Sequence, residues 1–352
     1  MAGFILNGTR IDEDGDCYVI AEVGHNHQGS LETAKKLFRA AKESGANAVK
    51  LQKRHNRALF TRAMYEQPYD NENSFGPTYG AHREALEFGV PQYRELQQYA
   101  REIGICFFAT AFDFQSADFL AKIDMPAYKI ASGDLRNTPL LKYIAQIGKP
   151  MFVSTGGASM EDVQRAYDQI MPFNRQLCIM QCTANYPAEP EDLNLRVIEA
   201  YRQTFPDILV GLSDHQSGIA MAMVGYILGA RVIEKHFTLN RAARGTDHAF
   251  SLEPVGLRKL VRDLRRARLA LGDGVKKPLP SEVKPLFKMG KKLVAARDLS
   301  SGQVMSRDDV AIKSPNDGLP PYELERVLGH TLTRDLKEDE NIAYGDLKET
   351  LD

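Results

Sequence analysis

The sequence contains no tryptophan, only four cysteines, and no apolar run of the ~18 residues that a membrane-spanning helix needs. No two cysteines form a Cys-x-x-Cys pair, so we interpret all four as reduced thiols in the core of a cytoplasmic protein. No signal peptide is recognisable, and we expect neither secretion nor a membrane anchor. The 45 Lys and Arg residues nearly balance the 46 Asp and Glu residues. A net charge of −1 gives no long-range attraction to nucleic acid or to a membrane surface.

A dinucleotide-binding Gly-x-Gly-x-x-Gly motif is also missing after the first apolar segment, which disfavours a doubly wound open sheet. Eight short apolar segments instead alternate with polar loops and amphipathic helices. Their near-continuous apolar character is typical of strands buried on both faces. Eight strand–helix units over roughly 250 residues predict a (β/α)8 TIM barrel. The expected strands are residues 17–24, 48–52, 106–110, 128–132, 151–155, 178–182, 208–214 and 231–236.

We predict three parts along the chain. Residues 1–271 form the barrel domain, including a hairpin around Asn7-Gly8 before the first barrel strand. Residues 272–292, rich in proline, glycine and lysine, form a linker. Residues 293–352 form a small β-rich domain. The long connection 53–90, rich in aromatic residues, His and Asn, is expected to cover the substrate.

Polar groups stand at the end of every predicted barrel strand, where the active sites of such barrels lie. Each occurrence alone is weak evidence, but the recurrence is strong. The residues are Glu22; Lys50 and Gln52; Thr110; Lys129, Ser132 and Asp134; Ser154; Gln181, followed by Asn185 and Tyr186; Ser213 and His215; and Glu234 and His236.

The chemistry of this ring indicates an anion site and a metal site. Lys50 and Lys129, with the hydroxyls of Thr110, Ser132, Ser154 and Ser213, suit a small oxyanion such as phosphate, and the backbone N–H groups around Gly156 suit it too. A single histidine at a strand end is usually a packing residue. His215 and His236 end neighbouring strands beside carboxylates, which favours one divalent metal with open positions for water or substrate.

The remaining ionisable groups divide by role. Glu22, Asp134, Glu234 and Asp247 could act as acid, base or metal support. Lys235 should point away from its two neighbours, because side chains alternate along a strand, and is expected to be structural.

Motifs throughout the barrel resemble, in register, the sialic acid synthase family. They include "IAEVGHNHQG", "YKIASGDLRNTPLL", "QCTANYP", "GLSDHQSGIA" and "VIEKHFTL". The segment "LVAARDLSSGQVMSRDDVAIKS" resembles the antifreeze-like (SAF) domain of that family. The resemblance implies condensation of phosphoenolpyruvate with an N-acylated hexosamine, either N-acetylmannosamine or a diacetamido-trideoxyhexose. The products would be a nine-carbon 2-keto-3-deoxy acid and phosphate.

The resemblance also implies roles for individual residues. It assigns His215 and His236 to a divalent ion, typically Mn²⁺, with Mg²⁺ or Co²⁺ as alternatives. For the proton transfers that the reaction needs, Glu22 and Asp134 are our own candidates. The resemblance further implies a homodimer in which the SAF domain of one chain caps the barrel of the other. Phosphoenolpyruvate would be held by Lys50, Thr110, Lys129, Ser132, Ser154 and Ser213, and the sugar by Gln52, Asn185, Tyr186 and Asp247, with Glu22 nearby.

Two departures concern the acceptor side. Family members commonly have Gly-Glu where this chain has Gly133-Asp134. Many bacterial members have an arginine that reaches the sugar's acyl group, at the position of Ser314.

Two alternatives remain open. A related synthase using a phosphorylated aldose would need a second phosphate site. No Arg/Lys cluster stands at the strand ends, although Arg54, Arg57 or Arg244 could supply one. A non-catalytic carbohydrate-binding or ice-binding protein is disfavoured, because a binding module has no need of two lysines, two histidines and several carboxylates around one barrel mouth.

Overall fold

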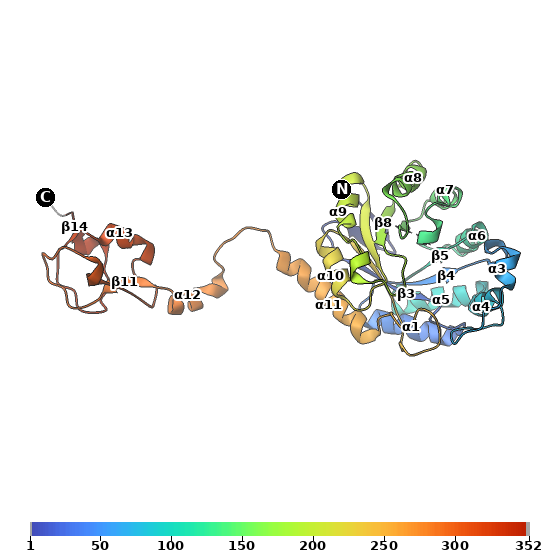
Figure 1. Ribbon diagram of the computed structural model, residues 1–352, viewed down its shortest axis with the longest axis horizontal. Coiled ribbons are helices and arrows are strands. Elements are labelled where there is room, and N and C mark those ends of the chain that lie inside the picture. The colour runs from blue at the N-terminus through green and yellow to red at the C-terminus, as the bar shows by residue number, and fades with distance from the viewer. Residues whose placement is uncertain (1, 350–352) are drawn as a thin grey trace. The chain divides into compact units, whose positions relative to one another are not determined.

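The computed structural model describes residues 2–349 and divides the chain into two compact units, residues 1–271 and 272–352. The larger unit is a closed barrel of eight parallel strands, because β10 pairs with both β9 and β3 (Figure 1). This confirms the predicted (β/α)8 fold. The strands are β3 (Tyr18–Gly24), β4 (Ala48–Lys53), β5 (Cys106–Ala111), β6 (Tyr128–Ile130), β7 (Met151–Ser154), β8 (Leu177–Cys182), β9 (Leu209–Asp214) and β10 (Val232–His236).

Eight helices form the outer ring, each following one barrel strand in the chain (Figure 1). The first begins as predicted, since the Ser30 hydroxyl accepts the Thr33 N–H and caps the helix. Its buried side chains, Ala34, Leu37, Phe38 and Ala41, pack on the strands. The helices are α1 (Leu31–Glu43), α5 (Val90–Ile103), α6 (Phe114–Lys122), α7 (Thr138–Ile147), α8 (Met160–Ile170), α9 (Val197–Thr204), α10 (Ala220–Ile227) and α11 (Pro254–Leu271).

A hairpin closes the amino-terminal end of the barrel. Strands β1 (Gly3–Leu6) and β2 (Thr9–Asp12) pair in antiparallel fashion around Asn7-Gly8, as predicted, and both turn residues have positive φ. The hairpin's apolar side chains join the inward-facing residues of the barrel strands, for example through an edge-to-face contact of Phe4 with Phe152. With this end filled, the opposite mouth is left for ligands.

Strand β10 shows how the alternation of side chains builds that mouth. Val232 belongs to the core inside the barrel, whereas Ile233 packs outward against the helices. Lys235 also points outward and pairs with Asp214 at 2.9 Å, which confirms its predicted structural role. Glu234 and His236 point inward.

The long connection after β4 folds into three short helices, α2 (Asn56–Leu59), α3 (Arg62–Glu66) and α4 (Tyr79–Ala85). An isolated bridge between Pro68 and Thr78 closes the loop between α3 and α4.

The smaller unit has its own core around Leu293, Val310 and Leu332. It is built from short antiparallel strand pairs, in agreement with the predicted β-rich domain. Its elements are α12 (Val283–Met289), β11 (Lys292–Ala295), β12 (Val310–Lys313), α13 (Leu324–Val327), β13 (Thr331–Leu332) and β14 (Leu347–Lys348). Short 3-10 helices complete the chain at Ser132–Asp134, Pro190–Asp192, Pro280–Glu282, Arg307–Asp309, Pro321–Glu323 and Tyr344–Asp346.

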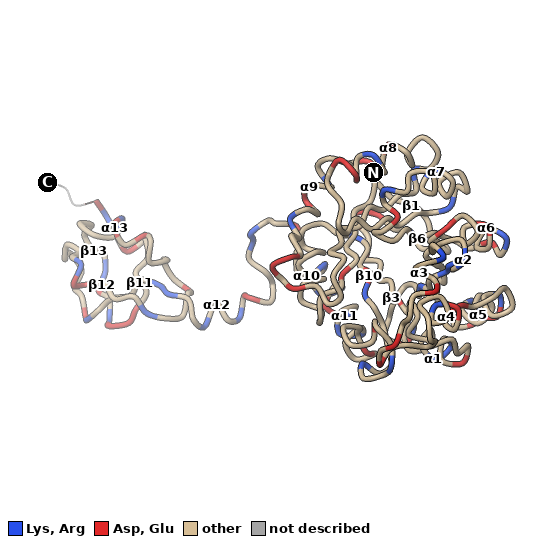
Figure 2. Tube along the Cα trace, turned by 45° about the vertical axis from the view of Figure 1, so that its right-hand side comes forward, with Lys and Arg blue, Asp and Glu red and all other residues tan. Residues whose placement is uncertain are grey.

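Charges of both signs are interspersed along both units (Figure 2). The basic helix α11 buries Leu257, Leu260 and Leu264 on the barrel, while Leu271, which fits the same spacing, is 57% exposed at the helix end. Among residues 2–349, no helix combines the length and the apolar character needed to cross a membrane.

Candidate active site

A cavity of about 640 Å³ opens at the carboxyl ends of the barrel strands. Every one of the eight strands, or the loop directly after it, contributes to its wall. The predicted site residues found on this wall are Glu22, Lys50, Gln52, Thr110, Lys129, Ser132, Ser154, Tyr186, Ser213, His215, His236 and Asp247.

Two buried lysines form the deep cationic end of the cavity. The Lys50 ammonium donates to Thr110 Oγ1 at 2.7 Å and lies 2.6 Å from Glu22 Oε2. The Lys129 ammonium donates to Ser154 Oγ at 2.6 Å. Both side chains are at most 3% exposed, so little water screens their charges.

Glu234 lies between these two lysines. Its Oε1 is 3.9 Å from the Lys50 ammonium and 3.8 Å from that of Lys129, and it accepts a hydrogen bond from Ser213. Burial by itself would raise the pKa of Glu234, but Lys129 and Lys50 outweigh it and lower the pKa. Glu234 is therefore ionised and balances the lysines before an anion arrives.

The two predicted metal-binding histidines lie next to each other at the ends of the neighbouring strands β9 and β10, edge to face, with ring centroids 5.3 Å apart. His215 Nδ1 lies 2.8 Å from the Thr183 carbonyl, so this nitrogen carries the proton and Nε2 keeps its lone pair. Burial and the neighbouring His236 lower the pKa of His215 to about 3. Within residues 2–349, His236 Nδ1 has no hydrogen-bond partner, and it lies 3.6 Å from Asp247 Oδ2.

Buried neutral histidines should make the barrel less stable in acid. Burial lowers the pKa of His27, like that of His215, to about 3, against ~6.5 in an unfolded chain. Protons therefore bind the unfolded chain first, and the free energy of unfolding should fall as the pH drops below about 6.5, by ~1.4 kcal/mol per pH unit for each histidine. Urea unfolding of metal-free protein between pH 7 and 5 measures this slope.

The matched variant is His27→Gln, because His27 Nδ1 accepts the Gly29 N–H and an amide oxygen can replace it. We expect this variant to reduce the slope by ~1.4 kcal/mol per pH unit. A slope identical to that of the wild type would show that His27 is not the titrating group.

The wall also contains Asn73 and Arg83, which the sequence did not single out, and Arg54, which it named only as one possible source of a second phosphate site. Arg54 follows β4, and Asn73 and Arg83 come from the long connection 53–90. Arg54 donates to Gln52 Oε1 at 2.7 Å, and Gln52 in turn donates to Glu22 Oε1 at 2.7 Å. Arg54 follows Gln52 by two residues, and this spacing was the one sequence signal that could have placed Arg54 on the wall. The sequence contains no comparable signal for Asn73 and Arg83.

Four predicted residues of the larger unit, Asp134, Gly156, Gln181 and Asn185, do not line the cavity, and the Gln181 amide donates instead to the Leu193 carbonyl at 3.1 Å. Asp134 lies in the short helix after β6, where burial raises its pKa and Asn137 donates to it at 3.3 Å. The Gly156 N–H donates to Ser132 Oγ at 2.9 Å, and an added Cβ at Gly156 would lie 2.9 Å from that oxygen. Asn185 is exposed and caps the Tyr186 N–H. Ser314 belongs to the smaller unit, where Lys291 donates to it at 2.6 Å.

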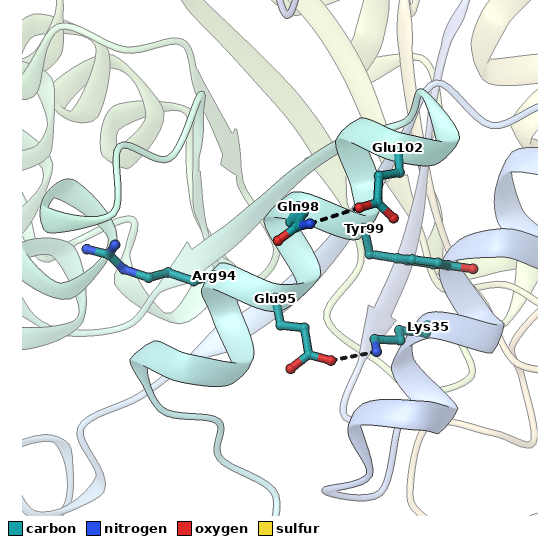
Figure 3. Close-up of a pocket in the computed structure, with 6 residues that line it drawn as sticks. All are labelled: Lys35, Arg94, Glu95, Gln98, Tyr99 and Glu102. Atoms are coloured by element: carbon teal, nitrogen blue, oxygen red, sulfur yellow. Dashed lines mark hydrogen bonds and ion pairs between the residues drawn. The ribbon is translucent and has the colours of Figure 1, made fainter.

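A second hollow, of about 520 Å³, lies on the outer surface between α1 and α5. Two pairs of its lining residues bond to each other: Lys35 donates to Glu95 at 2.6 Å, and Gln98 donates to Glu102 at 2.9 Å (Figure 3). With these groups already satisfied, we place no chemistry there.

Comparison with known proteins agrees with this architecture. The chain is 42% identical to N-acetylneuraminate-9-phosphate synthase of Homo sapiens, over 93% of this chain and 91% of that protein. It is 35% identical to N,N'-diacetyllegionaminic acid synthase of Legionella pneumophila, over 93% and 94% of the two chains. The crystal structure of the N-acetylneuraminic acid (sialic acid) synthetase of Leptospira borgpetersenii, 30% identical, superposes with a TM-score of 0.70, covering 80% of this chain and 94% of that one.

Family models match both units of the chain. Residues 37–276 match the NeuB family, and residues 292–348 match the SAF domain. The protein therefore belongs to the NeuB family of sialic acid synthases, with a barrel of that family followed by a SAF domain.

Proposed function

We propose that the protein condenses phosphoenolpyruvate with an N-acylated hexosamine to give a nine-carbon 2-keto-3-deoxy acid and phosphate. The single observation that carries this proposal is the cationic end of the cavity, where Lys50 and Lys129 meet the hydroxyls of Thr110 and Ser154. Family membership supports the same class of reaction, because the relatives are named for sialic and legionaminic acid synthesis.

In this reaction C3 of phosphoenolpyruvate attacks the aldehyde carbon of the open-chain sugar, and water adds at C2. The C–O bond to phosphate then breaks. Lys50 and Lys129 bind the phosphate and carboxylate groups of phosphoenolpyruvate. Because both ammonium groups are already held in position, they need no reorganisation as charge develops in the transition state. Glu234 keeps both lysines in place.

Proton transfer falls to carboxylates at the cavity. Glu22 lies on the wall, 2.6 Å from the Lys50 ammonium, and can exchange a proton with the C2 water or the sugar oxygen. Asp134, the second carboxylate predicted for this role, does not line the cavity, so its part in proton transfer stays a prediction.

A divalent ion, for which we propose Mn²⁺, fits the histidine pair. His215 offers a free Nε2 because its Nδ1–H is held by a carbonyl, which is the usual orientation of a ligating histidine. The buried Nδ1 of His236 finds no hydrogen-bond partner in the part of the chain that the structure describes. No group of three or more His, Cys, Asp or Glu side chains in residues 2–349 is arranged to hold a metal, so water and substrate oxygens would complete the coordination. The ion would supply Lewis-acid activation of the aldehyde.

The test is phosphate release from phosphoenolpyruvate with Mn²⁺ and a panel of acceptors, each with and without chelator. The panel contains N-acetylmannosamine, its 6-phosphate, a 2,4-diacetamido-trideoxyhexose, mannose and arabinose 5-phosphate. We expect metal-dependent release with an N-acylated hexosamine and none with mannose. Phosphoenolpyruvate labelled with ¹⁸O at the bridging oxygen should yield labelled phosphate. Label left in the keto acid would contradict C–O cleavage, and release with arabinose 5-phosphate alone would favour the phosphorylated-aldose alternative.

The four unpaired cysteines favour a cytoplasmic protein, and the resemblance implies a homodimer in which SAF domains cap the partner's barrel. Both stay predictions.

A further inference from the structure

The loop that follows β10 places two groups against His236. Asp247 Oδ2 lies 3.6 Å from His236 Nδ1, and the Phe250 ring packs on the imidazole with the two ring centroids 4.8 Å apart. Residues 246–250 form turns and belong to no helix or strand, so their position depends on individual contacts. Whatever holds this loop therefore decides where Asp247 lies beside the proposed metal ligand.

One side chain from the loop after β3 reaches this segment. Asn26 is only 4% exposed, and its Nδ2 donates to the Phe237 carbonyl at 3.0 Å and to Ser251 Oγ at 3.1 Å. The Ser251 hydroxyl, itself buried, donates to the Asp247 carbonyl at 2.5 Å. A continuous chain of hydrogen bonds thus runs from Asn26 to the main chain of Asp247.

The direction of each bond in this chain is fixed. A carbonyl can only accept, so Asn26 must present its NH₂ group toward Phe237. Ser251 has one hydroxyl proton, which it donates to the Asp247 carbonyl, so its oxygen accepts from Asn26. Both amide protons of Asn26 are therefore used, and an ionised carboxylate of the same shape could make neither bond.

Asn26 does not line the cavity, so its effect on the site is indirect. We infer that Asn26 is a positioning residue: through Ser251 it holds the Asp247 carboxylate beside His236, where the negative charge attracts the divalent ion. This inference rests on the proposed function, because it requires an ion at the histidine pair. Replacing a group that orients a metal site from behind typically costs about 10- to 100-fold in metal affinity.

A merely structural role for Asn26 makes a different prediction. Its bond to Phe237 joins the end of β10 to the loop after β3, so its loss should lower stability in either case. The His248 side chain attaches the same loop to Thr238 at 2.7 Å, a bond in which Asp247 takes no part. A residue that acts through Asp247 changes the metal affinity of the folded protein, whereas a structural one does not.

Calorimetric titration of the full-length protein with Mn²⁺ tests this role. We expect Asn26→Asp to weaken Mn²⁺ binding by about 10- to 100-fold, because the carboxylate lacks both donors. Ser251→Ala keeps the bond to Phe237 and should weaken binding by about 3- to 10-fold, whereas Ser251→Thr retains the hydroxyl and should stay within about threefold of the wild type. In an Asp247→Ala background, Asn26→Asp should cause no further loss.

The matched control is Asn174→Asp. Asn174 is also 4% exposed and donates its amide to a main-chain carbonyl, that of Lys149, at 2.7 Å. It lies just before β8, at the amino-terminal end of the barrel and away from the cavity. Its replacement should lower the midpoint of urea unfolding, as Asn26→Asp does, and leave Mn²⁺ affinity unchanged.

Two results would overturn the inference while the proposed function stands. One is wild-type Mn²⁺ affinity in both Asn26→Asp and Ser251→Ala, and the other is an undiminished effect of Asn26→Asp in the Asp247→Ala background. If Asn26→Asp does not fold, Ser251→Ala and its Ser251→Thr counterpart decide. Failure of the wild type to bind Mn²⁺ would instead overturn the proposed metal role, and this inference with it.

Discussion

Replacing Lys50 with methionine is expected to reduce kcat/KM for phosphoenolpyruvate by about 10²- to 10³-fold, because a preorganised cation at the phosphate is lost. The change also leaves Glu22 and Glu234 without their shared partner in a site that excludes water. Removing one member of a buried ion pair costs about 3–5 kcal/mol of stability, so the variant should also unfold at lower urea concentration. Steady-state kinetics on folded protein, together with urea unfolding, separate the two effects.

Lys235→Met provides the matched control. Lys235 is 1% exposed and pairs with Asp214 at 2.9 Å, yet it lies outside the barrel. Its loss should destabilise the protein to a similar extent, about 3–5 kcal/mol, while leaving kcat/KM of the folded protein within about threefold of the wild-type value. If both variants lost activity equally, the loss would reflect unfolding, and the assignment of Lys50 to the anion site would fail.

Removing the proposed metal is the second change with a large expected effect. Dialysis against chelator, or replacement of His236 by alanine, should lower the rate of phosphate release by about 10³-fold or more, since Lewis-acid activation contributes several kcal/mol. Added Mn²⁺ should restore the dialysed wild type but not the variant. Calorimetric titration with Mn²⁺ gives a readout independent of turnover: one site in the wild type and none in His236→Ala.

His248→Ala is the appropriate control for that experiment. His248 is a buried histidine in the loop after β10, bonded to Thr238 and absent from the cavity wall. Its replacement should leave Mn²⁺ binding intact. Unchanged activity in His236→Ala, or in chelator-treated wild type, would exclude the metal role.

The barrel and most of the residues that line its cavity were predictable from the sequence, because both depend on patterns within short segments of the chain. Each parallel strand is a short apolar run, and the carboxyl ends of all eight strands necessarily meet at one mouth. Their positions along the strands therefore predicted that four side chains meet at this mouth: Lys50, Lys129, His215 and His236. Even the outward direction of Lys235 followed, since neighbouring side chains on a strand face opposite ways.

Only the tertiary structure could place the residues that reach the cavity from irregular segments. Arg83 and Asn73 lie in a connection that the sequence marked as long but whose path it did not fix, and their position depends on how α2–α4 pack over the mouth. Asp134, predicted from its nearness to Ser132, lies off the wall because β6 ends at Ile130 and a 3-10 turn redirects the chain. Strand periodicity thus determined which residues stand at the proposed anion and metal sites. The proposed acceptor side was decided by the packing of loops, whose sequences show no periodic pattern.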